Sequence, residues 1–353
     1  MKALILVGGL GTRLKPITDS MPKHLIPLGN RPLIFYVFDK ILDSGIQDIG
    51  LVVSPNNKDF FQDSLDEYDK ELNISIIVQE RPLGVAHAVS ISKDFLGDEN
   101  FLLYLGDNLF EDDLKVIVDD FKKDSADASI VLKKVENPSS FGVAERNESG
   151  VVFKVLEKPT NPPTDLAVVG IYCFTPIIHK AIAQIKPSGR GELEITDAIQ
   201  YLLDNKFVVL SNQFTGWWLD CGTFDDLLLA NKEIIKSKLS HLEERNVKSS
   251  FGPEVILGDN SKIIDSIFKG PCIIGDNCLI ENSIIEGNTS IQSNSIVINS
   301  KVENSILMGN VKIKNLSLIS DSIIGKNCDI KSLEKGKSIA KLILGNSTEK
   351  IIK

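Results

Sequence analysis

The sequence lacks features that several common protein classes require. Its five cysteines include no C-x-x-C pair, so neither a disulfide framework nor a zinc site is indicated. The apolar run over residues 1–7 ends at Gly8, earlier than a signal peptide requires, and no later run is long enough to span a bilayer. We therefore expect a cytoplasmic protein with no membrane partner.

The sequence also lacks a basic tract. Lys and Arg number 39 against 48 Asp and Glu, which gives a formal net charge of −9. An acidic chain of this kind argues against a nucleic-acid partner or an anionic membrane surface. A small anionic substrate is compatible with it, because local cations decide such binding. None of the four histidines and five cysteines lies in a nucleophile motif.

Short apolar runs alternate with amphipathic ones up to about residue 225. Helical spacing is found over residues 32–45, 55–68 and 83–96, and this alternation predicts an α/β, Rossmann-like domain with a mainly parallel sheet. Beyond residue 125 the runs are denser, which favours a mixed sheet. The predicted strands, of which the first four read as buried on both faces, are Ala3–Val7, Ile49–Val53, Ile74–Val78, Phe101–Leu105, Ala128–Lys134, Val151–Leu156 and Ala167–Phe174.

A six-residue period replaces this alternation near residue 255. Aliphatic residues open hexapeptides such as LGDNSK, IGDNCL and IGKNCD, and they stand at positions 257, 274, 285, 291, 308 and 324. Such a period is typical of a parallel β-helix whose leading aliphatic side chains point inward. The fifth position also faces inward near a corner, which predicts a purely structural use for Cys278 and Cys328. Most of the gaps are filled by Ile263, Ile280, Val297, Val302 and Ile330.

A helical segment over residues 223–245 followed by polar NVKSSFGP indicates the boundary between the two parts. We therefore predict a catalytic domain over residues 1–240 and a β-helix domain over residues 250–345. The second domain would serve structure and assembly.

The first apolar run ends in a glycine-rich stretch, Gly8–Arg13. A P-loop is excluded because Thr12 and Arg13 stand where Gly-Lys is needed, and a dinucleotide fingerprint fails because Leu14 occupies its third glycine position. Residues without Cβ still let backbone N–H groups approach phosphate oxygens. Arg13 adds a forked donor and Lys23 a point charge, which suits a triphosphate. A glycine-rich turn with two solvated cations is the alternative.

Two aspartates follow apolar runs directly. Asp107 comes after FLLYLG, and Asp220 comes after WWL. Ligands of open α/β sheets lie beyond the carboxyl ends of strands, and a pair of carboxylates suits Mg²⁺, which takes its other ligands from phosphate and water. A lone aspartate in such a place can equally be a turn residue.

Two adjacent motifs, GGLGTRL (8–14) and PKHLIPLGNRPLI (22–34), resemble the signature of the sugar-1-phosphate nucleotidyltransferases. These enzymes join a nucleoside triphosphate to a sugar phosphate and release pyrophosphate. The similarity continues through PSGRGELEITDAIQYLL (187–203) and the hexapeptides to KLILGNSTEK (341–350), as in the long form of the glucose-1-phosphate thymidylyltransferases. It implies a C-terminal left-handed β-helix, dTTP and glucose 1-phosphate as substrates, Mg²⁺ as cofactor, and a homo-oligomer.

The resemblance also implies a set of site residues. Arg13, Lys23 and Lys158 would be catalytic, and Asp107 and Asp220 would hold the metal. The nucleotide would be bound by Leu6, Gly8, Gly9, Gly11, Thr12, Arg13, Lys23, Gln79, Gly84 and Asp107. The sugar phosphate would be bound by Gly142, Glu157, Lys158, Val168, Arg190 and Trp218.

Three neighbouring residues qualify this set. Pro159 should keep Lys158 out of the helical region, in an extended backbone that aims its side chain. Phe141 replaces the tyrosine common in the family, so any hydroxyl contact there is lost. Cys221 replaces a threonine that often follows the metal-binding aspartate, which puts a supporting hydrogen bond in doubt.

Other functions remain open at this point. A uridylyltransferase acting with UTP on glucose 1-phosphate or N-acetylglucosamine 1-phosphate is the main alternative, since thymine and uracil differ by one methyl group. A non-catalytic assembly subunit would have no reason to keep Arg13, Lys23, Asp107, Lys158 and Asp220 together. An acyltransferase built on the β-helix would need a histidine there, and none occurs after His241.

Overall fold

The computed structural model describes residues 1–123, 126–147, 150–244, 254–333 and 339–352. By the density of contacts the chain forms two compact units. The first compact unit is Met1–Gly9 with Ile34–Asp220, and the second compact unit is Leu10–Leu33 with Cys221–Lys353. The sequence-based domain boundaries at 240 and 250 remain predictions. The segment Leu10–Leu33, which carries Arg13 and Lys23, thus belongs with the C-terminal part of the chain.

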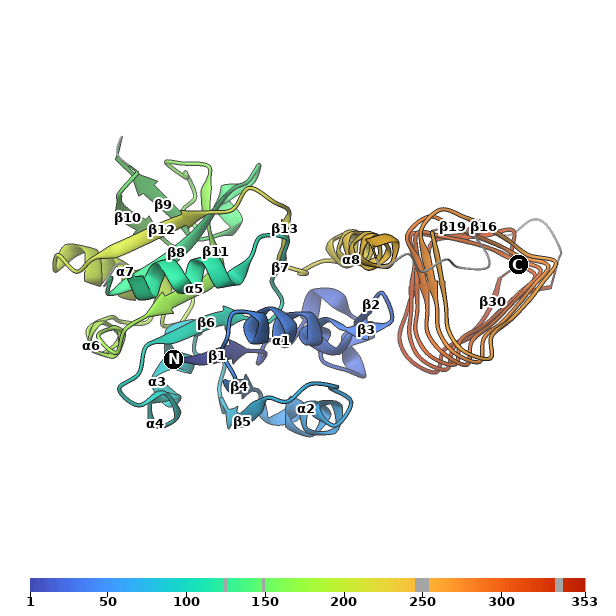
Figure 1. Cartoon of the computed structure of the whole chain (residues 1–353), viewed down its shortest axis with the longest axis horizontal. Coiled ribbons are helices and arrows are strands. Elements are labelled where there is room, and N and C mark those ends of the chain that lie inside the picture. Colours follow the sequence, from blue (N-terminus) through green and yellow to red (C-terminus); the bar gives the residue numbers. More distant parts are fainter. Residues whose placement is uncertain (124–125, 148–149, 245–253, 334–338, 353) are drawn as a thin grey trace. The chain divides into compact units, whose positions relative to one another are not determined.

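The first compact unit is built on a mixed nine-stranded sheet, as the sequence predicts (Figure 1). Its order is β10-β9-β11-β6-β1-β4-β5, with β8 paired to β11 and β12 to β8. Neighbouring strands from β6 to β5 run parallel, whereas β11 is antiparallel to β6, β8 and β9. The strands are β1 (Lys2–Leu6), β4 (Asp48–Val53), β5 (Asn73–Val78), β6 (Phe101–Leu105), β8 (Ala128–Lys134), β9 (Val143–Arg146), β10 (Val152–Leu156), β11 (Leu166–Phe174) and β12 (Val209–Gln213).

Burial follows position in this sheet. Strands β6 and β11 are almost wholly buried, as their unbroken apolar runs require. Strand β5 is half-exposed along its length, so the prediction that Ile74–Val78 is buried on both faces is wrong. The reason is that β5 lies at the edge of the sheet and has one neighbour only.

Helices connect these strands, and each predicted helical segment contains one or two of them. None of the helices in the described part of the chain combines the length and the apolarity that crossing a membrane would need. The helices are α1 (Leu33–Asp43), α2 (Lys58–Leu65), α3 (Val85–Ile91), α4 (Lys93–Leu96), α5 (Leu114–Lys123), α6 (Ile178–Ile182), α7 (Ile195–Asp204) and α8 (Phe224–Glu244). Single 3₁₀ turns are η1 (Thr12–Leu14), η2 (Ile17–Asp19), η3 (Lys23–Leu25), η4 (Pro55–Asn57) and η5 (Pro138–Ser140).

Two further two-stranded ladders complete these elements. Strand β7 (Leu109–Phe110) pairs antiparallel with β13 (Trp218–Leu219) in the first compact unit. Strand β2 (Pro27–Leu28) pairs with β3 (Arg31–Pro32) in the second. The first ladder carries the segment that leads to Asp220.

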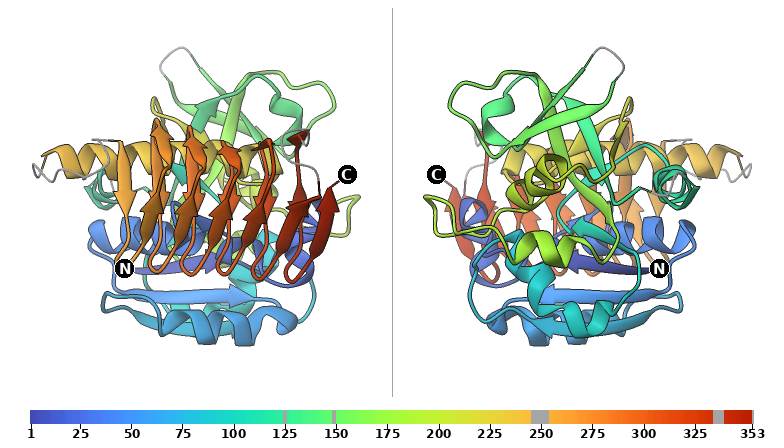
Figure 2. Two further views of the ribbon diagram at one scale, coloured as in Figure 1. Left: turned by 90° about the vertical axis from the view of Figure 1, so that its right-hand side faces the viewer. Right: turned by 90° about the vertical axis from the view of Figure 1, so that its left-hand side faces the viewer.

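The C-terminal strands form a parallel β-helix of three faces, which confirms the prediction from the hexapeptides and fits the left-handed type (Figures 1 and 2). Face A is β14 (Val255–Leu257), β17 (Cys272–Ile274), β20 (Thr289–Ile291), β23 (Ile306–Leu307), β26 (Ile323–Ile324) and β29 (Ile343–Leu344). Face B is β15 (Lys262–Ile264), β18 (Leu279–Glu281), β21 (Ile296–Ile298), β24 (Lys312–Lys314), β27 (Asp329–Ser332) and β30 (Glu349–Ile352). Face C is β16 (Ile267–Lys269), β19 (Ile284–Glu286), β22 (Lys301–Glu303), β25 (Leu318–Ser320) and β28 (Ile339–Ala340).

The inward columns of the β-helix are apolar, as the period predicts. Ile280 pairs in register with Val297, and Val297 pairs with Ile313, all three fully buried. Burying one such side chain contributes roughly 1.5–3 kcal/mol. Cys278 and Cys328 are buried in the same core, in agreement with their predicted structural use.

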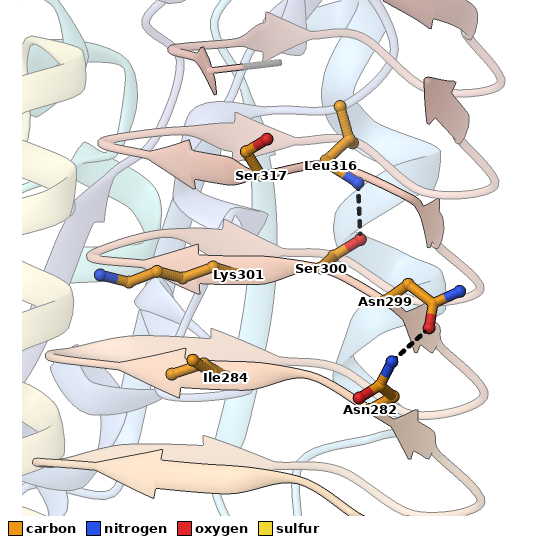
Figure 3. Close-up of a pocket in the computed structure, with 7 residues that line it drawn as sticks. All are labelled: Asn282, Ile284, Asn299, Ser300, Lys301, Leu316 and Ser317. Carbon is orange, nitrogen blue, oxygen red and sulfur yellow. Dashed lines mark hydrogen bonds between the residues drawn. The ribbon is translucent and has the colours of Figure 1, made fainter. Parts of the chain in front are cut away.

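The corners carry a second repeat that the hydrophobic period does not reveal. Asn282 and Asn299 have φ of +47° and +49°, a left-handed conformation that asparagine tolerates better than most residues. The Asn282 amide donates to Oδ1 of Asn299 at 2.7 Å, one coil along (Figure 3). Ser300 Oγ likewise accepts a hydrogen bond from the Leu316 N–H at 3.1 Å. The serine ladder satisfies polar groups that the stacked coils would otherwise bury unpaired, whereas the Asn282–Asn299 bond lies at the exposed corner.

Candidate active site

The predicted site residues divide between the two compact units. Gly11, Thr12, Arg13 and Lys23 belong to the second. All others belong to the first, namely Leu6, Gly8, Gly9, Gln79, Gly84, Asp107, Gly142, Glu157, Lys158, Val168, Arg190, Trp218 and Asp220.

A charged cluster in the first compact unit brings together residues predicted to bind the sugar phosphate. The Arg190 guanidinium donates through Nη2 to Glu157 Oε1 and to Glu194 Oε1, each at 2.9 Å. The Thr196 hydroxyl donates to the other oxygen of Glu157 at 3.0 Å. Partial burial alone would lower the pKa of Arg190, but the hydrogen bonds that it donates to Glu194 and Glu157 outweigh burial and raise the pKa. Arg190 is therefore a permanent cation held by two carboxylates.

Gly142 packs against the Glu157–Thr196 part of this cluster. A Cβ at Gly142 would lie 2.8 Å from Thr196 Cγ2 and 3.3 Å from Glu157 Oε2, so glycine leaves the room that the Glu157–Thr196 pair occupies. The Val168 N–H donates to the Gly142 carbonyl at 2.7 Å. These two backbone groups therefore join β11 to the segment before β9.

Lys158 follows Glu157, and its Nζ lies 3.9 Å from Glu157 Oε1. Its backbone has φ +38°, so the predicted extended conformation is wrong, although the residue does avoid the right-handed helical region. The Lys158 N–H donates to the Phe141 carbonyl at 3.1 Å, which turns the chain at this point. A left-handed lysine is a strained position of the kind that concentrates at functional sites.

Asp107 is half-buried and follows strand β6 after a single glycine. Its Oδ1 accepts a hydrogen bond from the Asn108 side chain at 2.8 Å, and Asn108 Oδ1 in turn accepts one from the Trp218 indole at 2.7 Å. The Trp218 ring meets Phe141 edge to face, with centroids 5.2 Å apart. A continuous chain of contacts thus links Asp107 to the segment beside the Arg190 cluster.

The β7–β13 ladder brings the second aspartate to the same place. Leu219 pairs with Leu109 in the last pair of the ladder, so Asp220 leaves the ladder at the end where Asn108, the residue after Asp107, enters it. No group of three or more His, Cys, Asp or Glu side chains in the described residues could hold a metal ion. A pair of carboxylates fits a hard cation that draws its other ligands from substrate phosphate and water.

Gln79 directly follows strand β5 and lies beside Gly8, the first glycine of the loop. Its Nε2 donates to the Gly84 carbonyl at 3.2 Å and lies 2.9 Å from His87 Nδ1. A Cβ at Gly8 would lie 3.6 Å from Gln79 Oε1. Gly84 has φ +101°, and a Cβ there would lie 2.5 Å from the Leu193 carbonyl oxygen. Glycine is therefore needed at 84 for the contact with the 193 segment as well as for the loop.

In the second compact unit the signature segment folds back on itself. Gly11 has φ +61°, and its carbonyl accepts a hydrogen bond from the Thr18 hydroxyl at 2.8 Å. A Cβ at Gly11 would lie 3.5 Å from Lys23 Cβ. The backbone two residues before Arg13 therefore lies next to the base of the Lys23 side chain. The Arg13 guanidinium lies against Gly222, where a Cβ would be 2.7 Å from Nη2. Gly222 thus leaves room for Arg13 two residues after Asp220.

Five supporting residues were not found from the sequence. Asn108 and Gly222 are neighbours of predicted residues, and Glu194 and Thr196 lie inside the quoted 187–203 segment. His87 is three residues from the predicted Gly84. Nothing in the hydrophobic pattern marks them, because each acts through a polar contact or a close approach and not through burial of an apolar side chain.

The cysteines are unsuited to nucleophilic work, in line with the expectation. Burial raises the pKa of Cys173 and of Cys272 to about 12. Two hollows, of about 280 and 440 Å³, lie on the second compact unit, and no predicted site residue lines them (Figure 3). The contacts above, and not these hollows, define the candidate site.

Similar proteins show the family to which the chain belongs. A family model described as nucleotidyl transferase matches residues 2–237. The low-salt glycan biosynthesis nucleotidyltransferase Agl11 of Haloferax volcanii is 43% identical over 67% of this chain and 67% of its own length. A glucose-1-phosphate thymidylyltransferase of Streptomyces griseus is 41% identical over 77% of each chain.

A solved structure assigned as a glucose-1-phosphate thymidylyltransferase from Bacillus anthracis has a TM-score of 0.61 and 35% identity. The match covers 65% of this chain and 94% of that one. Nucleotidyltransferases of this family generally use a divalent metal ion, which the pair of carboxylates at Asp107 and Asp220 fits. On the extent of the family match and on these relatives, the chain is a member of the nucleotidyl transferase family.

Proposed function

We propose that this enzyme transfers a deoxythymidylyl group from dTTP to glucose 1-phosphate, giving dTDP-glucose and pyrophosphate. The observation that carries the proposal is the grouping of Glu157, Lys158 and Arg190 at one end of a contact chain whose other end is Asp107. A sugar phosphate suits this grouping, because its hydroxyls can donate to a carboxylate while its phosphate pairs with the neighbouring cations. The name of the Streptomyces griseus relative supports dTTP and glucose 1-phosphate as the substrates.

The reaction needs no enzyme nucleophile. An oxygen of the sugar phosphate attacks the α-phosphorus in line, the bond from that phosphorus to the bridging oxygen breaks, and pyrophosphate leaves. The attacking phosphate is already anionic near neutral pH, so the obstacle is repulsion between two anions. Positioning and charge compensation therefore account for most of the rate enhancement.

Each charged residue has one part in this scheme. Arg13 would bind the β- and γ-phosphates and the departing pyrophosphate, and Lys23 would neutralise charge at the α-phosphate. Lys158 would hold the attacking phosphate. Asp107 and Asp220 would hold Mg²⁺, which when bound adds positive charge at the phosphates.

Arg190 enters this scheme already paired. Its two carboxylate partners, Glu157 and Glu194, lie at 2.9 Å. We propose that the sugar phosphate competes for Arg190 while a sugar hydroxyl donates to Glu157. The exchange keeps every charge paired, because Glu194, which is only 5% exposed, stays beside the guanidinium.

The base would be read by Gln79 and Gly84, with Leu6, Gly8, Gly9, Gly11 and Thr12 lining the path of the nucleotide. Gly142, Val168 and Trp218 would line the sugar. A cytoplasmic location and a homo-oligomeric state remain predictions that complete this picture.

A panel of turnover measurements tests the proposal. dTTP, UTP, ATP, CTP and GTP are each assayed for pyrophosphate release with glucose 1-phosphate and with N-acetylglucosamine 1-phosphate. The expected result is the highest kcat/KM for dTTP with glucose 1-phosphate. Higher kcat/KM with UTP would make the enzyme a uridylyltransferase, and turnover with no pair would remove the proposed activity.

A further inference from the structure

The outer surface of face A is buried over its four middle strands, β17, β20, β23 and β26, unlike that of the other two faces. On faces B and C the strands alternate between a buried middle residue and more exposed neighbours, as in Lys312–Lys314. On face A all three residues of β17 and of β20 are buried. Part of the cover is α8, whose Ile235 and Leu239 pack against Ile273.

The outward positions of face A form a column in register from coil to coil. Its members are Ile256, Ile273, Ser290, Ile306, Ile323 and Ile343. Five are isoleucine, and Ser290 is the one polar member. A buried serine inside an aliphatic column costs stability unless its hydroxyl is paired.

Ser290 is paired with an asparagine of α8. Its hydroxyl donates to Asn231 Oδ1 at 3.0 Å, and Asn231 Nδ2 donates to the Asn288 carbonyl at 2.8 Å. Oδ1 of Asn231 also accepts the Gly29 N–H at 2.7 Å. Asn231 has no exposed surface. One buried side chain thus joins the β-helix, α8 and the segment Leu10–Leu33.

Gly29 lies at the tip of a tight hairpin that closes the signature segment. Strands β2 and β3 are joined by Gly29 and Asn30 alone, with φ of +52° and +67°, as a type I′ turn requires. The Asn30 amide donates to the Ile291 carbonyl at 2.8 Å, and Lys238 donates to the Gly29 carbonyl at 2.8 Å. Both residues of the turn are therefore fixed to the C-terminal part of the chain.

The same segment touches the β-helix at a second level. A Cβ at Gly345 would lie 3.0 Å from the Pro16 carbonyl oxygen, so Pro16 lies directly on the turn after β29. Strands β20 and β29 are three steps apart on face A. The stretch between Pro16 and Asn30 is thus held at two separate coils, and Lys23 lies within it.

We propose that Asn231 is a positioning residue through which the β-helix fixes the segment Leu10–Leu33 in the conformation that binds the triphosphate. The inference rests on the proposed use of Arg13 and Lys23. Asn231 touches no substrate. It acts by holding the Gly29–Asn30 turn, and the Ser290 hydroxyl selects the one coil at which that turn can dock.

The test uses the full chain and four variants. Asn231→Ala and Ser290→Ala each remove part of the hydrogen-bond network around Asn231. Ser290→Thr keeps the hydroxyl on a residue that suits a strand. Ser300→Ala is the matched control, because Ser300 is an equally buried serine of the β-helix whose hydrogen bonds stay within it. KM for dTTP, KM for glucose 1-phosphate and kcat are measured for each, with amide hydrogen exchange over residues 10–33.

We expect Asn231→Ala and Ser290→Ala to raise KM for dTTP by about tenfold, within the usual range of coupling between sites. KM for glucose 1-phosphate should stay unchanged, and exchange over residues 10–33 should accelerate. Ser290→Thr and Ser300→Ala should bind dTTP like wild type. Equal rises in both KM values, or unchanged KM for dTTP in a folded Ser290→Ala, would overturn the proposal.

Hydrogen exchange separates this inference from the proposed activity. If wild type turns over no triphosphate, the proposed function fails, whereas the coupling of Asn231 to the loop is still read from protection of the 10–33 segment. If Asn231→Ala does not fold, Ser290→Ala decides the same question. Unchanged protection in both folded variants would show that the network does not hold the loop.

Discussion

Two asparagines, one in each compact unit, make nearly the same hydrogen bonds. Asn108 donates to Asp107 at 2.8 Å and accepts from Trp218 at 2.7 Å. Asn299 donates to Asn315 at 3.0 Å and accepts from Asn282 at 2.7 Å. The partners of Asn299 are copies of itself on adjacent coils, whereas those of Asn108 are a carboxylate and an indole.

This difference separates stability from function. In the β-helix each asparagine amide donates a hydrogen bond to the equivalent residue of the next coil, so removing one amide weakens the stack only at that coil. Beside Asp107 the amide fixes the direction of a carboxylate, so losing it should disturb chemistry more than folding. The same contrast extends to the aspartates, lysines and glutamates of the two units, and substitutions can test it.

The largest effect is expected at the two carboxylates proposed to hold the metal. Asp107→Asn and Asp220→Asn should each lower kcat by orders of magnitude, since a neutral amide binds a divalent cation much more weakly than a carboxylate does. Steady-state kinetics in Mg²⁺ measure the change, and circular dichroism checks the fold. Asp321→Asn is the control, because Asp321 accepts an amide hydrogen bond from Asn304 in the β-helix ladder. Near wild-type activity in either variant would remove that residue from the metal site.

A smaller effect is expected at Lys158. Lys158→Ala should raise KM for glucose 1-phosphate by roughly tenfold or more, the cost of one hydrogen bond to a charged group. KM for dTTP should change little. Lys314→Ala, on a solvent-facing position of β24, is the control and should change neither value. Unchanged kinetics for the sugar phosphate would take Lys158 out of the site.

The sequence predicts most of both architectures, for two different reasons. The β-helix is predictable because its inward columns need an aliphatic residue at a fixed step, as from Ile280 to Val297. The strand-end aspartates are predictable because Asp107 interrupts a fully apolar run. The edge position of β5 was not predictable, because it depends on which strands pair and not on the composition of the strand.

Contacts between distant segments account for what the sequence leaves out. Gly29 and Asn231 are 202 residues apart, and no local pattern links them. The pairing of Arg190 with Glu157 spans 33 residues and leaves the arginine bound to carboxylates before any phosphate arrives. The left-handed backbone at Lys158 goes together with its hydrogen bond to Phe141, and the following proline alone implies neither.

The two asparagines offer the direct test of the opening comparison. Asn299→Ala should lower the free energy of unfolding by about 1–2 kcal/mol, since alanine is strained at φ +49°, and leave kcat unchanged. Asn299→Gly should recover part of that loss. Asn108→Ala should lower kcat. The resulting rise in the activation free energy of the reaction should exceed the loss in the free energy of unfolding. Denaturant titration measures the free energy of unfolding of the three variants, and steady-state kinetics measure kcat. If Asn299→Ala were fully folded and yet inactive, the distinction between a structural and a functional asparagine would be wrong.

The smallest effect is expected at Glu286, on the surface of face C. Its carboxylate lies 2.5 Å from Lys301 and 2.9 Å from Lys269, and hydrogen bonds from these lysines lower its pKa below the ordinary 4.5. A lowered pKa means that the folded state binds fewer protons than the unfolded state, so the pairs stabilise the fold above pH 4.5 and lose that contribution as the pH falls through the folded pKa. Glu286→Gln should therefore lower Tm slightly at pH 7, and this difference should shrink as the pH falls through the folded pKa. Since exposed ion pairs are screened, salt should shrink the pH 7 difference as well. A Tm difference that widens on acidification would show that Glu286 stabilises the coil by a route other than its charge.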